Sequence, residues 1–177
     1  MPRSELDLNP VQHITADAIG KPGQRVFYLQ GWQEADIQPV TVIIEKLQLQ
    51  TLATGLEQML AEIAQQNPAL GGASAEYDED KMHITPPVDP LFRAGEMGLG
   101  YDADHDQIII LVREIVMEDG DPEEASVVRF WCSRLQAGWL AGWSRKIVNR
   151  GRPLCPQCGQ PMEPEGHFCP KKNGHKH

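Results

Sequence analysis

Three cysteines and a histidine near the C-terminus are the residues in this chain best suited to chemistry. Cys155 and Cys158 form a Cys-x2-Cys pair, and His167 and Cys169 follow as His-x-Cys. Thiolate sulfur and imidazole nitrogen are ligands that Zn2+ prefers, and four of them complete a tetrahedral shell. The spacing therefore predicts one structural Zn2+ per chain in a small zinc knuckle, with no coordination position left for a substrate.

The fourth zinc ligand has alternatives within the same tail. His175 or His177 could take the place of His167, although the end of the chain is rich in lysine. A redox role for the Cys-x2-Cys pair is less favoured, because thioredoxin-like sites need a strand-then-helix context that this motif lacks. The remaining cysteine, Cys132, follows two aromatic residues in an apolar run and is predicted to be a buried core residue.

Basic side chains surround the predicted zinc site. The net charge of the chain is −9, yet the C-terminal part is positive and the rest is acidic. This asymmetry predicts a patch for an anion or an acidic partner. Cations at a helix C-terminus together with solvated tail lysines explain it more simply, and the tail could also dock on the acidic body. The candidate patch residues are Arg145, Lys146, Arg150, Arg152, Lys171 and Lys172.

The hydrophobic periodicity predicts an α+β fold of two β-β-β-α halves that share one core. Weak similarity between the halves, such as Gly55-Leu56 with Gly142-Trp143, suggests an internal duplication. Residues 1–10 are expected to be frayed. The predicted strands are 11–19, 25–33, 40–45, 92–101, 107–116 and 126–132, and the predicted helices are 47–65 and 133–151. The predicted domains are 1–150, with halves of about 11–66 and 91–150, and a zinc-knuckle tail at 151–177.

Two further motifs favour structural roles. The acidic segment 102–106 lacks the glycine and glutamate that a calcium loop needs, so we expect a hairpin turn. Gly95, Gly98 and Gly100 are not followed by Lys-Ser/Thr, so bulges or tight packing in a strand are expected there. The sequence offers no catalytic partner for the scattered histidines, and the tryptophans at 131, 139 and 143 are expected in the core.

The segments 25–30, 90–101 and 151–169, together with Asn173-Gly174, resemble a bacterial family of uncharacterised proteins, domain of unknown function 3090. The resemblance covers nearly the whole chain and implies the ligand set Cys155, Cys158, His167 and Cys169. Family members are often encoded beside a histidine-phosphatase-like and a kinase-like protein, which implies a phosphate-related pathway. The chain departs from the family pattern after Val116, where its tryptophan-rich helix is heavier.

The function is therefore left between hypotheses of different classes. The leading one is a non-enzymatic, zinc-containing interaction or adaptor protein with a protein partner. The alternative is an enzyme, or enzyme subunit, that handles a phosphorylated small molecule with Arg145, Arg150, Arg152 and the segment 95–100. Nucleic-acid binding by the tail is weaker, because the acidic bulk repels phosphates. With no secretory signal and no membrane-spanning run in the sequence, a cytoplasmic protein is expected.

Overall fold

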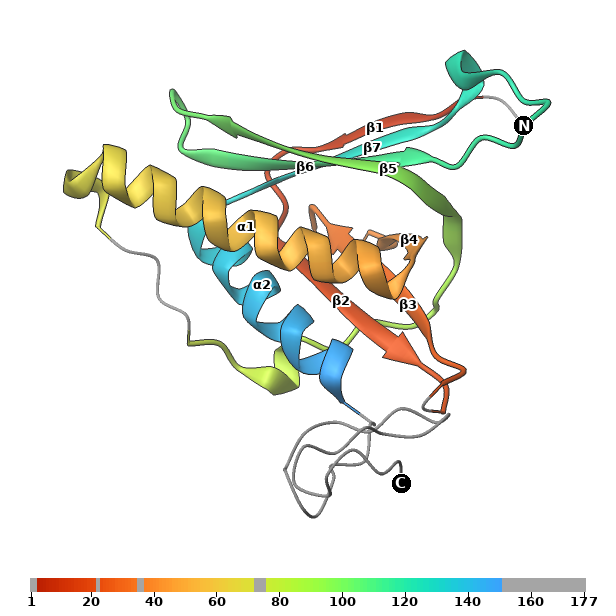
Figure 1. Cartoon of the computed structure of the whole chain (residues 1–177), viewed down its shortest axis with the longest axis horizontal. Coiled ribbons are helices and arrows are strands. Elements are labelled where there is room, and N and C mark those ends of the chain that lie inside the picture. The colour runs from red at the N-terminus through yellow and green to blue at the C-terminus, as the bar shows by residue number, and fades with distance from the viewer. Residues whose placement is uncertain (1–2, 22, 35–36, 72–75, 151–177) are drawn as a thin grey trace, which may run out of the picture.

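The computed structural model describes residues 3–21, 23–34, 37–71 and 76–150. Within these residues one sheet of seven strands, in the order β1-β7-β6-β5-β4-β3-β2, packs with two α-helices (Figure 1). The predicted α+β fold is therefore confirmed. The strands are β1 (Glu5–Leu8), β2 (His13–Ile19), β3 (Val26–Trp32), β4 (Val40–Ile44), β5 (Pro90–Asp102), β6 (Gln107–Glu114) and β7 (Val127–Cys132). The helices are α1 (Lys46–Gln66) and α2 (Arg134–Asn149).

The sheet curves so that its two ends meet. Its first and last strands, β1 and β2, are consecutive in the chain. Between them, the Val11 N–H donates to the Trp131 carbonyl at 2.9 Å, and the Gln12 N–H donates to the Trp32 carbonyl at 2.8 Å. The expectation that residues 1–10 are frayed was wrong for β1, which pairs in parallel with β7. The two paired strands lie far apart in the sequence, so no local sequence pattern predicts their pairing.

The order of elements repeats as predicted. Strands β2, β3 and β4 lead into α1, and strands β5, β6 and β7 lead into α2. Both helices begin with a capping box, formed by Glu45 and Gln48 in α1 and by Ser133 and Gln136 in α2. Such boxes satisfy backbone N–H groups that the first helical turn leaves free. The repeat fits the suggested duplication and places the two helices side by side (Figure 1).

The two halves share one core. Leu49, Leu52 and Leu56 form the buried face of α1, as the three- and four-residue spacing predicts. Trp143 of α2 is fully buried, and its indole N–H donates to the Ala16 carbonyl of β2 at 2.6 Å. No helix in the described segments is long and apolar enough to cross a membrane.

Candidate functional site

The predicted zinc ligands lie outside the described residues, as do three members of the predicted basic patch. The zinc knuckle therefore stays a prediction. The residues concerned are Cys155, Cys158, His167 and Cys169, with Arg152, Lys171 and Lys172. Within the described ranges, no group of three or more His, Cys, Asp or Glu residues could hold a metal ion.

The remaining basic residues of the predicted patch do lie together, at the C-terminal end of α2. Arg145, Lys146 and Arg150 line a depression of about 490 Å³ with Asn149 and Glu79. Glu79 belongs to a short 3-10 helix, η2 (Glu79–Lys81), in the connection between the two halves.

Most of this positive charge is matched by nearby carboxylates. Arg145 contacts Glu57 of α1 at 2.6 Å, and this ion pair holds the pKa of the Glu57 carboxyl below its usual range. Lys146 pairs with Glu79, and the Arg150 guanidinium lies 3.6 Å from the same carboxylate. Three cations therefore face two carboxylates, and the depression keeps only a small excess of positive charge.

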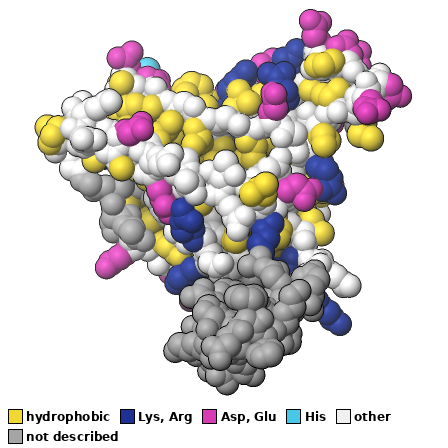
Figure 2. All heavy atoms as spheres, in the orientation of Figure 1, with side chains coloured by type: hydrophobic (Ala, Val, Ile, Leu, Met, Phe, Trp, Pro, Cys, Tyr) yellow, Lys and Arg dark blue, Asp and Glu magenta, His cyan; other side chains and the backbone are white. Residues whose placement is uncertain are grey.

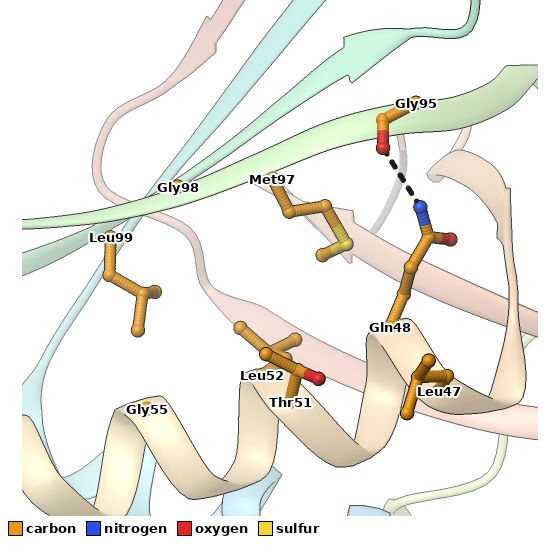
Figure 3. Close-up of a pocket in the computed structure, with 9 residues that line it drawn as sticks. All are labelled: Leu47, Gln48, Thr51, Leu52, Gly55, Gly95, Met97, Gly98 and Leu99. Atoms are coloured by element: carbon orange, nitrogen blue, oxygen red, sulfur yellow. Dashed lines mark hydrogen bonds between the residues drawn. The ribbon is translucent and has the colours of Figure 1, made fainter.

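The glycine segment of β5 does not lie in that depression. Gly95 and Gly98 line a different cavity, a groove of about 460 Å³ between β5 and the first half of α1 (Figure 3). The structure therefore brings the basic residues together but does not bring the glycines to them. As expected, the glycines sit in a strand, whose pairing with β6 shifts register between Ala94 and Met97.

The lining of this groove is mainly apolar. Met97 and Leu99 project from β5 toward α1, where Leu52 and Gly55 face them (Figure 3). Figure 2 shows hydrophobic side chains gathered on this face over β5 and α1. Leu47, at the start of α1, also lines the groove and is 71% exposed. The groove thus leaves apolar surface open to water, which is typical of binding sites.

A close approach of α1 to β5 closes one end of the groove. A Cβ atom at Gly55 would lie only 2.9 Å from a methyl carbon of Leu99. Toward the start of α1 the two elements separate, and the Gln48 side chain bridges them (Figure 3). The Gln48 amide donates to the carbonyls of Gly95 at 3.0 Å and Ala94 at 3.3 Å.

The other end of the groove is cationic. Lys46 and Arg93 line an adjoining depression of about 260 Å³, one residue before Leu47 and two residues before Gly95 of the groove. Arg93 contacts the Glu45 carboxylate at 3.0 Å. With Arg25, three cations and one carboxylate thus line the depression at the point where the groove opens.

Two histidines gain carboxylate partners that the sequence did not suggest. His83 Nδ1 lies 3.2 Å from Asp17 Oδ2, and the His83 ring packs edge-on against Trp143 with centroids 5.1 Å apart. His105 Nδ1 lies 2.8 Å from Asp102 Oδ2 inside the predicted hairpin turn. The first contact joins distant segments, so sequence spacing could not reveal it.

The comparisons with known proteins identify a family without assigning an activity. The family model described as "Protein of unknown function (DUF3090)" matches residues 6–169, nearly the whole chain. The chain therefore belongs to this family, as the resemblance of its motifs indicated. No curated protein and no solved structure matches.

Proposed function

We propose that the protein is a zinc-containing interaction or adaptor protein and that its partner binds in the groove between α1 and β5. The observation that carries the proposal is the open apolar lining of the groove, with Leu47 71% exposed beside it. Burial of such surface by a partner yields about 25 cal/mol for each Å² removed from water. The partner would be a protein, because an open groove between a strand and a helix, lined mainly by apolar side chains, can receive the apolar side chains of a partner segment.

The charged residues elsewhere support a binding role over a catalytic one. Arg145 is engaged by Glu57, Lys146 by Glu79, and Arg134 by the Asp106 carboxylate at 2.8 Å. These ion pairs connect separate elements of the fold, so the charged side chains have a structural role. The proposed zinc knuckle would follow α2 directly and fix the chain beyond it.

Comparative capture from cells tests the interaction. Leu47→Glu places a carboxylate in the groove, and an acidic residue in the first turn of a helix favours folding. Met117→Glu is the matched control, because Met117 is also 71% exposed and does not line the groove. We expect at least one cellular protein that the wild type and Met117→Glu capture in equal amounts. Leu47→Glu should no longer capture this protein. If quantitative mass spectrometry finds no protein with this pattern, the proposal fails.

One observation favours a second candidate, the handling of a phosphorylated small molecule. Lys146 and Arg150 share the single carboxylate of Glu79, and Asn149 adds an amide donor to the same depression. A phosphate group could accept from these donors. Turnover of a panel of phosphoesters by the purified chain would favour this candidate over the adaptor. Complete inactivity, with and without added zinc, would remove it.

A further inference from the structure

We propose that the partner enters the groove as an extended peptide that adds a strand to the free edge of β5. The inference rests on the proposed function, because it names the kind of segment that the groove binds. Strand addition gains affinity from main-chain hydrogen bonds and specificity from pockets for alternate side chains. An unpaired strand edge, an apolar floor and a cationic end carry the inference.

The unpaired edge arises where β4 stops. β4 pairs with β5 at Pro90 and Arg93 and then ends at Ile44, where the chain turns into α1. β5 continues to Asp102 and pairs with β6 along its other edge. Beyond Arg93, no described strand lies along the first edge of β5. Unpaired N–H and C=O groups of this kind form a template for an incoming strand.

Helix α1 hydrogen-bonds only the beginning of that edge. The Gln48 amide donates to the Gly95 carbonyl (Figure 3) and also to the Ala94 carbonyl. Among the described residues, no other side chain within α1 hydrogen-bonds the β5 backbone. At Gly98, a Cβ atom would meet nothing within 4 Å, so this part of the strand is not crowded by neighbours. The backbone around Gly98, between the Gln48 contact at Gly95 and the close approach of Gly55 to Leu99, is thus reachable.

The floor of the groove sets which side chains the peptide should carry. Successive side chains of a strand point to opposite faces, so every second residue of an added strand would turn toward α1. There it would meet Leu52, Met97 and Leu99. We therefore expect apolar residues at alternate positions of the peptide.

The cationic end adds a preference for charge. Arg25, Lys46 and Arg93 line this depression with one carboxylate, that of Glu45, which leaves an excess of positive charge at the opening. A peptide with an aspartate or glutamate at that end is complementary, and its attraction should weaken as salt is added. The expected ligand is thus an extended segment with alternating apolar residues and one acidic end.

Selection of peptides tests this ligand directly. A phage-displayed library of random linear peptides is selected on the full chain, and the best sequence is synthesised. We expect alternating apolar residues and an acidic end. N-methylation of one alternate set of its amides should weaken binding about tenfold or more, and N-methylation of the other set should leave it unchanged. Selection of no binding peptide, or an equal effect of both methylation patterns, would overturn strand addition.

Protein variants locate the selected peptide. Thr51 lines the groove and is exposed, so Thr51→Trp fills the groove and should weaken binding about tenfold or more. Gln58→Trp is the matched control, on an exposed position of the same helix outside the groove lining, and should bind as the wild type does. Circular dichroism checks that both fold, and Leu47→Glu replaces Thr51→Trp if that variant does not. Equal binding of the peptide to the wild type and the folded groove variant would overturn the proposal.

The outcomes separate this inference from the function on which it rests. Suppose that Leu47→Glu loses a cellular partner, but that both N-methylation patterns affect the binding segment of this partner equally. This result would overturn strand addition and leave the interaction function standing. The opposite result is also possible: the selected peptide is weakened by only one methylation pattern and by Thr51→Trp, but no cellular protein depends on Leu47 for capture. This result would support strand addition and count against the adaptor function.

Discussion

Gly31 of β3 lies directly against the ring of Phe130 in β7, and a Cβ atom at Gly31 would be 2.9 Å from two ring carbons. These residues belong to different halves of the chain, and both are buried. The aromatic ring of the second half therefore occupies the space that a side chain in the first half would need. This contact shows that neither half has a complete core of its own.

Gly31→Ala should destabilise the fold because the Phe130 ring must move. Overpacking of this kind typically costs about 1–3 kcal/mol. Gly98→Ala is the control, since a Cβ atom there meets nothing within 4 Å, and its free energy of unfolding should stay within about 0.5 kcal/mol of the wild type. Urea denaturation measures both variants. Equal stabilities of the two would contradict the shared core.

As the pH falls below about 6.5, protonation of His13 should destabilise the protein before the carboxylates become protonated. Burial lowers the pKa of His13, and a hydrogen bond to the Lys81 backbone offsets this only in part. In the unfolded chain, histidine binds a proton at about pH 6.5. The His13 contribution is thus fully present above that pH and is lost as pH falls toward the lower folded pKa.

Replacement of His13 by Asn should flatten the dependence of unfolding free energy on pH just below 6.5. Thermal unfolding over a pH series gives the comparison. A slope in His13→Asn that equals the wild-type slope would show that His13 does not cause it.

Cys132 should resist alkylation in the native protein. Its thiol is buried and donates to the Ile108 carbonyl at 3.5 Å, which confirms the expected core position. Burial raises the pKa of this thiol to about 12, so the reactive thiolate is scarce at neutral pH. Iodoacetamide followed by peptide mass spectrometry should label Cys132 only after denaturation. Labelling of native protein at the unfolded rate would contradict its burial.

The proposed zinc site predicts about one zinc per chain by elemental analysis. Cys155→Ser and Cys169→Ser should each lose the metal, because structural zinc affinity depends on the full ligand set. Cys132→Ser supplies the control, since this buried cysteine is not part of the motif and should leave zinc content unchanged. Full zinc retention by either tail variant would refute the ligand assignment.

Local patterns in the sequence predicted the fold well. The alternation in 40–45 and the three- and four-residue spacing in 47–65 place β4 and α1 within two residues of their bounds. Ser133, the first residue of the predicted helix 133–151, caps α2 by accepting from the Gln136 N–H. Trp143 is buried as expected because it shares a helix face with other apolar residues.

Features that depend on distant contacts were missed. Trp131 was expected in the core, but it lies half-buried on β7 and its indole N–H donates to Asp7 of β1 at 2.8 Å. Its surroundings are set by the parallel pairing of β1 with β7, which has no local signature. The groove was missed for the same reason. The early end of β4 and the continuation of β5 become a free edge only once the two strands are paired.

Hydrogen–deuterium exchange of the full chain, alone and bound to the Leu47-dependent cellular partner, tests the central claim most directly. The account predicts slower exchange in residues 46–55 of α1 and 94–102 of β5, the two sides of the groove. It predicts no change around Arg145, Lys146 and Arg150 at the end of α2. Slower exchange confined to the end of α2, with β5 unchanged, would contradict it.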